Sequence, residues 1–310
     1  MGRGLRTVFQ RWAVWAALAL AGVLLGAPAV LAQDAAGAPA GEPAASSSAS
    51  SSIWVERISY NQYLAQHAGA PTPEVEIAIP AAAFTAKSAD MEADVLVDAY
   101  GRPGESLLTG ERGWVEWTVE VPEAGWYSIE IDYYPAPGRG TSIEREIQIN
   151  GEVLFSGAEL LVFHRIFGDE GPFLKDIGGN EIRPRQVEKP MWRTVFLSDS
   201  LGYVRGPYQF YLREGENTIR LISRAEPMVI GELRIKQPPR IRPYAEVRAE
   251  YERAGYRPTQ GHMIVVQGEH ATLRSSPALF PVFDQGDPTT EPYHPAEIRL
   301  NSIGGHRWQV

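Results

Sequence analysis

Residues 115–135, VEWTVEVPEAGWYSIEIDYYP, alternate apolar and polar side chains, pause at Pro-Glu-Ala-Gly, and then alternate again. Alternation with a period of two is typical of a strand that buries one face. The stretch therefore predicts a hairpin of two strands joined by a tight turn. The predicted inward side chains are Val115, Trp117, Val119 and Val121 before the turn and Tyr127, Ile129, Ile131 and Tyr133 after it.

More short strands of this kind are predicted along the chain. Asn150-Gly151 favours the left-handed backbone of a turn after SIEREIQI. Residues 208–221 predict another hairpin and residues 228–236 a closing strand. Short helices are predicted at residues 60–67 and 244–256. Such strands, with turn signals about every ten residues, predict an all-β fold, a two-sheet sandwich of jelly-roll type.

The N-terminal segment predicts export. Residues 1–32 carry arginines and then an apolar run that ends in Val-Leu-Ala, the small-residue pattern that signal peptidase cuts. We expect cleavage before Gln33 and a secreted, cell-surface protein. An uncleaved transmembrane anchor is the alternative, because the run has roughly the 20 residues that a bilayer needs. Its many alanines and Pro28 favour the signal peptide.

Composition divides the rest of the chain. Residues 33–52 hold no aromatic or branched apolar side chain and predict a disordered linker. Residues 53–236 are expected to form one complete sandwich module, and residues 237–261 a Pro-rich connector with a short helix. Residues 262–310 are similar to the beginning of the first module, since EIRLNSIGGHRWQV follows the Leu, Gly and Trp order of GESLLTGERGWVEW. We expect an incomplete second sandwich module there, in a sequence that continues beyond Val310.

Composition also argues against some functions. The chain has no cysteine, so neither thiol chemistry nor disulfides are available to it. Its net charge of −9 gives no basic surface for phosphate backbones, so nucleic acid is not an expected partner. A membrane is expected to meet the chain only through the signal segment.

Several stretches together resemble a known family: VEWTVEVPEAGWYSIEIDYYP, SIEREIQINGE, GNEIRPRQVEKPMW, GYVRGPYQFYL, RAEPMVI and TEPYHPAEIRLNSIGG. They are similar to the N-terminal modules of large bacterial extracellular solute-binding proteins of carbohydrate ABC importers. Those modules resemble galactose-binding-like jelly rolls and carbohydrate-binding modules of the family 6 and 35 type. The hinged two-lobe solute-binding domain itself is not in this chain, so the resemblance implies the binding function of the module itself rather than transport by this polypeptide alone.

The resemblance implies a non-catalytic carbohydrate-binding protein. Its expected partners are an oligo- or polysaccharide and, through a domain missing from this chain, an ABC importer permease. A structural interaction module of a cell-surface protein is one alternative. An accessory domain of a glycoside hydrolase is another.

Catalytic motifs are missing from the sequence. It has no His-Glu-x-x-His, Walker loop or Gly-x-Ser-x-Gly, and its six histidines lack metal-ligand spacing. A glycosidase pair among the loop carboxylates is the alternative, but none of them lies in an apolar run that would raise its pKa. The sequence therefore predicts that the chain is not an enzyme. The carboxylates weighed are Glu144, Asp169, Glu170 and Asp176.

Proteins recognise sugars with flat aromatic rings, which pack on the C–H faces of a pyranose, and with polar groups that bond its hydroxyls. Trp117, Tyr127 and Tyr133 are expected in the core. Rings at strand ends or in loops are better candidates, although a single such ring more often packs than binds, so polar neighbours add to the prediction. The predicted carbohydrate-binding residues are Tyr134, Arg139, Glu144, Asp176, Asn180, Trp192, Asp199 and Tyr203.

Calcium is the cofactor that the resemblance implies, because jelly-roll carbohydrate modules often hold one ion between carboxylates on the first and last strands. Glu232 in VIGELRI stands on the last strand of the first module, and Glu269 in VVQGEHA on the first strand of the second. In the first module Ala81 stands where the other carboxylate is expected. Calcium requires several oxygen ligands, so these two glutamates are candidate ligands in separate modules.

Residues 157–192 form a long stretch between core strands. Segments of this length without regular structure are functional or disordered, and the aromatics Phe163, Phe167, Phe173 and Trp192 predict an ordered one. It is expected either to cap one end of the sandwich and shape a groove, or to pack as an inserted loop.

Overall fold

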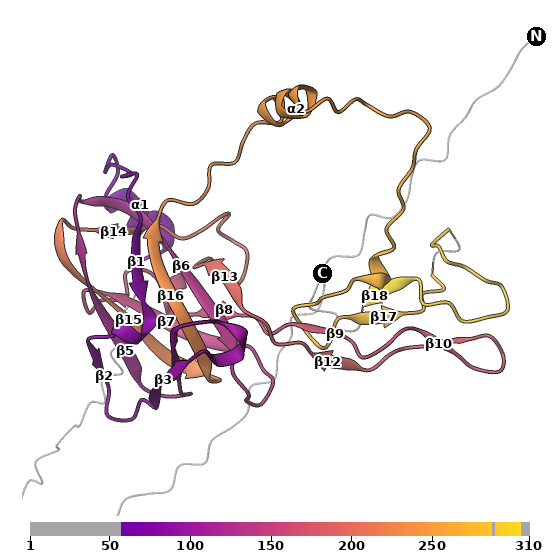
Figure 1. Ribbon diagram of the computed structural model, residues 1–310, viewed down its shortest axis with the longest axis horizontal. Helices are drawn as coiled ribbons and strands as arrows, with labels where there is room; N and C mark the ends of the chain where they lie inside the picture. The colour runs from indigo at the N-terminus through magenta and orange to yellow at the C-terminus, as the bar shows by residue number, and fades with distance from the viewer. Residues whose placement is uncertain (1–56, 287–288, 305–310) are drawn as a thin grey trace, which may run out of the picture. The chain divides into compact units, whose positions relative to one another are not determined.

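The computed structural model describes residues 57–286 and 289–304 of the chain (Figure 1). The predicted signal peptide at 1–32 and the predicted linker at 33–52 lie outside the described residues. By its contacts the described part belongs to one unit, Trp54–Val310.

Two antiparallel sheets confirm the predicted all-β sandwich. The large sheet contains seven strands: β1 Ile77–Pro80, β3 Ala93–Val97, β4 Glu105–Thr109, β6 Gly125–Pro135, β13 Arg193–Phe196, β14 Phe210–Leu212 and β16 Met228–Lys236. Their order is β13-β6-β16-β4-β3, with β1 also beside β16 and β14 also beside β6. The small sheet contains five: β2 Ala86–Lys87, β5 Trp114–Val121, β7 Ile143–Ile149, β8 Leu161–Phe163 and β15 Gly215–Ala225. Their order is β2-β5-β15-β7-β8.

The core lies between the sheets and contains the predicted apolar stripes. Every predicted inward side chain of β5 and β6 is at most 5% exposed. Trp117 lies in this core, and its Nε1 donates a hydrogen bond to the carbonyl of Ala81 at 3.0 Å. Complete burial of one such apolar side chain contributes about 1.5–3 kcal/mol, so this core is the main source of stability.

The partners of these strands differ from the predicted hairpins. β5 pairs with β15 and β2 in the small sheet, whereas β6 pairs with β16, β13 and β14 in the large one. The turn at residues 122–124 therefore carries the chain from one sheet to the other, because the two apolar stripes enter one core from opposite sides. The run 208–221 also crosses between sheets, through β14 and β15. The turn at Asn150-Gly151 is confirmed, with φ of 53° and 81°.

The long stretch 157–192 is ordered and largely forms a hairpin. β9 (Phe167–Asp169) pairs with β12 (Gln186–Glu188), and β10 (Leu174–Lys175) pairs with β11 (Glu181–Ile182).

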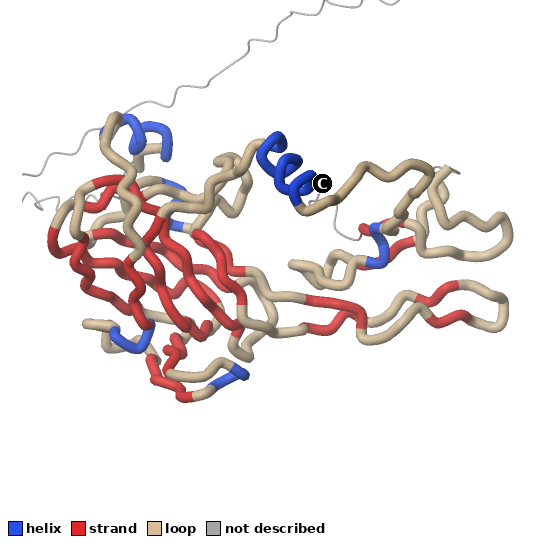
Figure 2. Tube along the Cα trace, turned by 45° about the horizontal axis from the view of Figure 1, so that its top comes forward, coloured by secondary structure: helices blue, strands red, loops and turns tan. Residues whose placement is uncertain are grey.

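The segment after β16 is mainly loop, drawn tan in Figure 2. Within it, β17 (Phe280–Val282) pairs with β18 (Ser302–Gly304). The segment contacts the long hairpin, because Phe167 and Arg274 exchange two backbone hydrogen bonds of 2.8 Å and the Arg274 guanidinium pairs with Asp169. The domain boundaries of the sequence analysis, including the second module at 262–310, stay predictions.

Two short α-helices confirm the sequence predictions, α1 (Tyr60–Gln66) and α2 (Tyr244–Arg253). A capping box between Ser59 and Gln62 begins α1. No described helix is long and apolar enough to cross a membrane. The short 3-10 helices are η1 Ala81–Ala83, η2 Ala99–Gly101, η3 Ser156–Glu159 and η4 Gly268–His270.

Candidate functional site

Three aromatic rings gather on the outer face of the large sheet. Tyr134 points outward because its neighbour Tyr133 points into the core. Its ring stacks on Tyr100 of η2 at 4.3 Å and 22°, and lies 5.7 Å from Trp192, the residue before β13. The indole of Trp192 donates to the carbonyl of Tyr100 at 3.1 Å. We name these three rings the sheet-face cluster, and it contains two residues predicted to bind sugar, Tyr134 and Trp192.

A hydrogen-bonded carboxylate lies beside the sheet-face cluster. Asp132 accepts hydrogen bonds from Arg102 at 2.9 Å and Arg234 at 2.8 Å, and another from the hydroxyl of Thr194. Burial by itself would raise the pKa of Asp132, but these donors outweigh it and hold the pKa below its usual value. Asp132 is therefore a carboxylate at neutral pH, fixed as an acceptor.

Arg102 connects this network to the rings. Its Cζ lies 5.0 Å from the centre of the Trp192 ring. The guanidinium also lies against the backbone of β16, where a Cβ on Gly231 would come within 2.6 Å of Cζ. Glycine at this position therefore allows the close approach.

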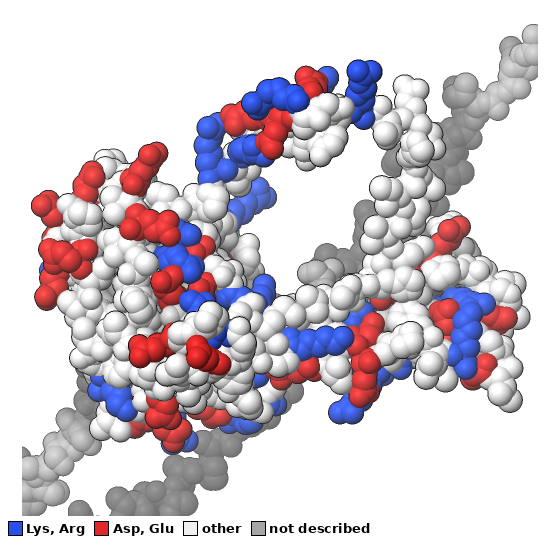
Figure 3. Space-filling model, viewed as in Figure 1, with Lys and Arg blue, Asp and Glu red and all other residues white. Residues whose placement is uncertain are grey.

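Paired charges continue along the same face. Glu130 pairs with Arg234 at 2.9 Å and with Lys236 at 2.8 Å. Figure 3 shows acidic and basic side chains side by side over β16 in this view. Such a surface offers both donors and acceptors next to the rings.

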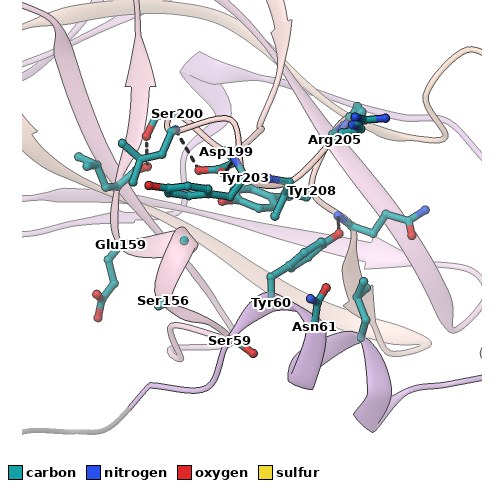
Figure 4. Close-up of a pocket in the computed structure, with 18 of the residues that line it drawn as sticks. Ser59, Tyr60, Asn61, Ser156, Glu159, Asp199, Ser200, Tyr203, Arg205 and Tyr208 are labelled. Atoms are coloured by element: carbon teal, nitrogen blue, oxygen red, sulfur yellow. Dashed lines mark hydrogen bonds between the residues drawn. The ribbon is translucent and has the colours of Figure 1, made fainter. Parts of the chain in front are cut away.

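A second feature is a cavity of about 840 Å³, lined by α1, η3 and the loop after β13; we name it the loop pocket (Figure 4). It contains two other predicted residues, Asp199 and Tyr203. Figure 4 shows the rings of Tyr203, Tyr208 and Tyr60 together at the pocket. Tyr203 is 86% exposed.

Asp199 is engaged inside its own loop. Its carboxylate accepts from the backbone amides of Leu201 at 3.0 Å, Tyr203 at 2.6 Å and Val204 at 2.9 Å. Burial acts to raise the pKa of Asp199, yet these amides lower it overall. Burial and the nearby Asp199 carboxylate raise the pKa of Tyr208 to about 12. Asp199 therefore shapes the loop that presents Tyr203, and its oxygens are already used.

Arg139 and Glu144 belong to neither feature. Arg139 pairs with Glu226 at 3.2 Å and with Glu111 at 3.1 Å, and Glu144 lies on β7 in the small sheet. Glu226 also accepts from Arg165 at 2.7 Å and is fully buried. The pair of Arg139 with Glu226 ties the loop before β7 to the turn between β15 and β16. Nothing in the sequence singles out Glu226, which has an unusual positive φ of 62°.

Asp176 and Asn180 lie in the turn of the long hairpin. Asp176 accepts from the amides of Gly178 at 2.8 Å and Asn180 at 2.9 Å, and hydrogen bonds from the Asn180 side chain and these amides lower its pKa. The Asn180 side chain accepts from the amide of Ile298 at 2.8 Å. Both residues thus have contacts that shape the turn and join it to the C-terminal segment.

The candidate calcium ligands do not meet. Glu232 lies on β16 and pairs with Arg234 at 2.6 Å, while Glu269 lies in η4 and is 2% exposed. Among the described residues, no group of three or more His, Cys, Asp or Glu side chains is placed to hold a metal ion. A calcium site in this chain stays a prediction.

Sequence reasoning missed Tyr100, Arg102 and Asp132. Tyr100 and Arg102 lie in the loop sequence DAYGRPG, where glycine and proline indicate a turn but not its neighbours. Asp132 was only one of the outward positions of a strand. The contact between these residues depends on the pairing of β6 with β16 and β13, which the sequence does not reveal.

Comparison with known proteins gives a distant likeness in fold. Neither a family model nor a curated protein matches the chain. Among solved structures, the chain is similar to the Podospora anserina GH26-CBM35 β-(1,4)-mannanase, with a TM-score of 0.33 and 12% identity over 55% of this chain and 29% of that one. A family 35 carbohydrate-binding module from Clostridium thermocellum gives 0.32 and 15% over 53% of this chain and 99% of that one. The C-terminal CBM6 of LamC, a laminarinase from Zobellia galactanivorans, gives 0.31 and 14% over 53% and 100%.

Proposed function

We propose that this chain is a non-catalytic carbohydrate-binding protein whose glycan lies on the sheet-face cluster. The observation that carries this proposal is the meeting of three rings, Tyr100, Tyr134 and Trp192, on the outer face of one sheet. Flat rings pack against the C–H faces of sugars, and several neighbouring rings can follow successive sugar units.

The charged groups beside the rings suit hydroxyl recognition. Asp132 bonds Arg102 at 2.9 Å and so holds its guanidinium next to Trp192, where it can donate to a hydroxyl with little loss of side-chain freedom on binding. An open face of this kind buries few ligand atoms. We expect dissociation constants on the order of 10 µM to 1 mM.

Carboxylate chemistry supports a binding role over hydrolysis. A glycosidase acid needs a raised pKa, whereas hydrogen bonds lower the pKa of both Asp132 and Asp176. Asp169, another carboxylate of the sequence analysis, is engaged by Arg274 at 2.8 Å. Neither Asp132 nor Asp176 is therefore poised to donate a proton to a leaving sugar.

The biological setting is part of the proposal. The export signal predicted in residues 1–32 supports secretion and display at the cell surface. The resemblance to N-terminal modules of solute-binding proteins supports service to a carbohydrate ABC importer, with the permease as an indirect partner. A structural module without sugar affinity, and an accessory domain of a glycoside hydrolase, are the alternative settings.

Affinity gel electrophoresis of the full chain tests the proposal. Gels contain β-glucan, xylan, mannan, galactan or starch, each with and without calcium. We expect at least one polysaccharide to retard the wild type, and Trp192→Ala to lose most of the retardation while its melting temperature stays within a few degrees. Trp114→Ala is the matched control, because Trp114 is also a half-buried tryptophan under an arginine, on the other sheet. Equal retardation of all three proteins, or of none by any glycan, rejects the proposal.

A further inference from the structure

The walls of the loop pocket are held independently of the sheet-face cluster. Tyr60 of α1 accepts from the amide of Gln209 at 2.8 Å, and Tyr63 accepts from that of Tyr211 at 2.7 Å. These hydroxyls satisfy the free edge of β14 and join α1 to the sandwich. Burial raises the pKa of Tyr63 to about 12, so its hydroxyl stays protonated.

The floor of the pocket is also fitted closely. A Cβ on Gly157 would come within 2.2 Å of the Tyr208 hydroxyl. Glycine in η3 therefore lets Tyr208 lie under the pocket, next to Asp199. The opposite wall is the loop that Asp199 holds through three backbone amides. The cavity is thus shaped by fixed contacts on each side.

Polar groups at the rim are left free for a ligand. Within the described part of the chain, the side chains of Asn61, Ser156 and Arg205 and the phenol of Tyr203 have no hydrogen-bond partner. In contrast, both carboxylates at the pocket are engaged, Asp199 by amides and Glu159 by Arg57. Free donors and acceptors around one exposed ring match a ligand that offers many hydroxyls and an apolar face.

We propose that the loop pocket is a second saccharide site, which takes the end of a short neutral oligosaccharide against the ring of Tyr203. The amide of Asn61, the hydroxyl of Ser156 and the guanidinium of Arg205 bond its hydroxyls. This inference extends the proposed carbohydrate-binding function, but it depends on different residues. Trp192 precedes β13 and the pocket loop follows it, so the two sites lie at opposite ends of one strand.

A second site changes what the chain can do with a polysaccharide. When one site is occupied, the other meets the same polymer at a high local concentration. Two weak sites therefore retain a polymer much longer than either alone, while each still releases a short sugar quickly.

Calorimetric titration of the full chain tests this inference. The probes are cellohexaose, xylohexaose, mannohexaose, laminarihexaose and maltohexaose, and the proteins are the wild type, Tyr203→Ala, Trp192→Ala and the double variant. We expect the wild type to bind two oligosaccharides per chain, each single variant one, and the double variant none. Tyr203→Phe should keep both sites. Tyr244→Ala is the matched control, because Tyr244 is 75% exposed in α2, away from the pocket residues.

The other outcomes separate this inference from the proposed function. If the wild type binds one oligosaccharide, Tyr203→Ala binds equally and Trp192→Ala does not bind, the pocket is not a saccharide site and the proposed function stands. If Tyr203→Ala alone abolishes binding, the pocket is the site and the sheet-face cluster is not. Absence of binding by every probe overturns both. Because Tyr203 is so exposed, its variants should melt with the wild type, which thermal unfolding checks.

Discussion

The outer faces of the two sheets carry the same small motif with different surroundings. On the large sheet, Arg102 lies over Trp192 at 5.0 Å and bonds Asp132. On the small sheet, Arg220 lies over Trp114 at 3.9 Å and bonds Glu116. Among the described residues, the large sheet alone adds two further rings to this pair, Tyr100 and Tyr134.

The difference shows which part of the motif is unusual. A tryptophan under an arginine is common on protein surfaces and contributes modest stability. Tyr100 and Tyr134 turn one such pair into a row of rings, and Tyr100 is 42% exposed. The row, rather than the cation over the tryptophan, therefore distinguishes a candidate binding face from ordinary surface packing.

The largest expected effect is a difference in unfolding free energy between matched substitutions on the two sheet faces. Asp132 is 6% exposed and bonds two arginines, so Asp132→Ala leaves both cations without their shared partner. Removal of one partner from a fully buried ion pair costs about 3–5 kcal/mol of unfolding free energy, and we expect a loss at or below the lower end because Arg234 keeps Glu130 and Glu232. Urea denaturation followed by circular dichroism measures this loss.

Glu116→Ala is the matched control on the small sheet. The Glu116 carboxylate is more exposed than that of Asp132, and partly exposed ion pairs such as Glu116–Arg220 contribute about 1 kcal/mol or less to the unfolding free energy. A loss for Asp132→Ala no larger than that for Glu116→Ala would mean that the network on the large sheet is ordinary surface charge.

A smaller change in the unfolding free energy is expected at low pH. Asp132 and Asp199 have pKa values below the usual 3.8 in the folded chain. As the pH falls, the two carboxylates bind protons in the unfolded chain before they do so in the folded chain. Their contribution to stability is therefore present above pH 3.8 and is lost as the pH falls through their folded pKa values. Each carboxyl changes the unfolding free energy by at most about 1.4 kcal/mol per pH unit.

Urea titrations between neutral pH and pH of about 3 measure this slope. Asp132→Asn should flatten this slope relative to the wild type. A slope of equal size in Asp132→Asn and the wild type would remove Asp132 from the account of acid stability.

The strands could be predicted from the sequence, but their partners could not. The alternation at residues 115–135 placed every inward side chain correctly, because burial depends on the period of two along one strand. The same alternation fits a hairpin and a turn between sheets equally well. Only the contacts of β5 with β15 and of β6 with β16 decide between them.

The candidate sites, like the strands, could be predicted from the sequence only in part. Strand-end position indicated Tyr134 and Trp192, and the structure brings these two rings together with Tyr100. Asp199 has the residue type that sugar sites use, yet its oxygens are taken by backbone amides of its own loop. Residue type and spacing suggest which side chains are available, whereas hydrogen-bond partners decide which remain free.

The most direct measurement follows the two indole N–H signals of the contrasting tryptophans by ¹H–¹⁵N NMR. Trp192→Phe and Trp114→Phe assign the signals by their loss. During titration with the oligosaccharide that calorimetry selects, the Trp192 signal should shift and saturate, because the indole donates within the ring cluster, while the Trp114 signal stays in place. A saturating shift of Trp114 with Trp192 unmoved, or no shift of either signal, would contradict a glycan site on the large sheet.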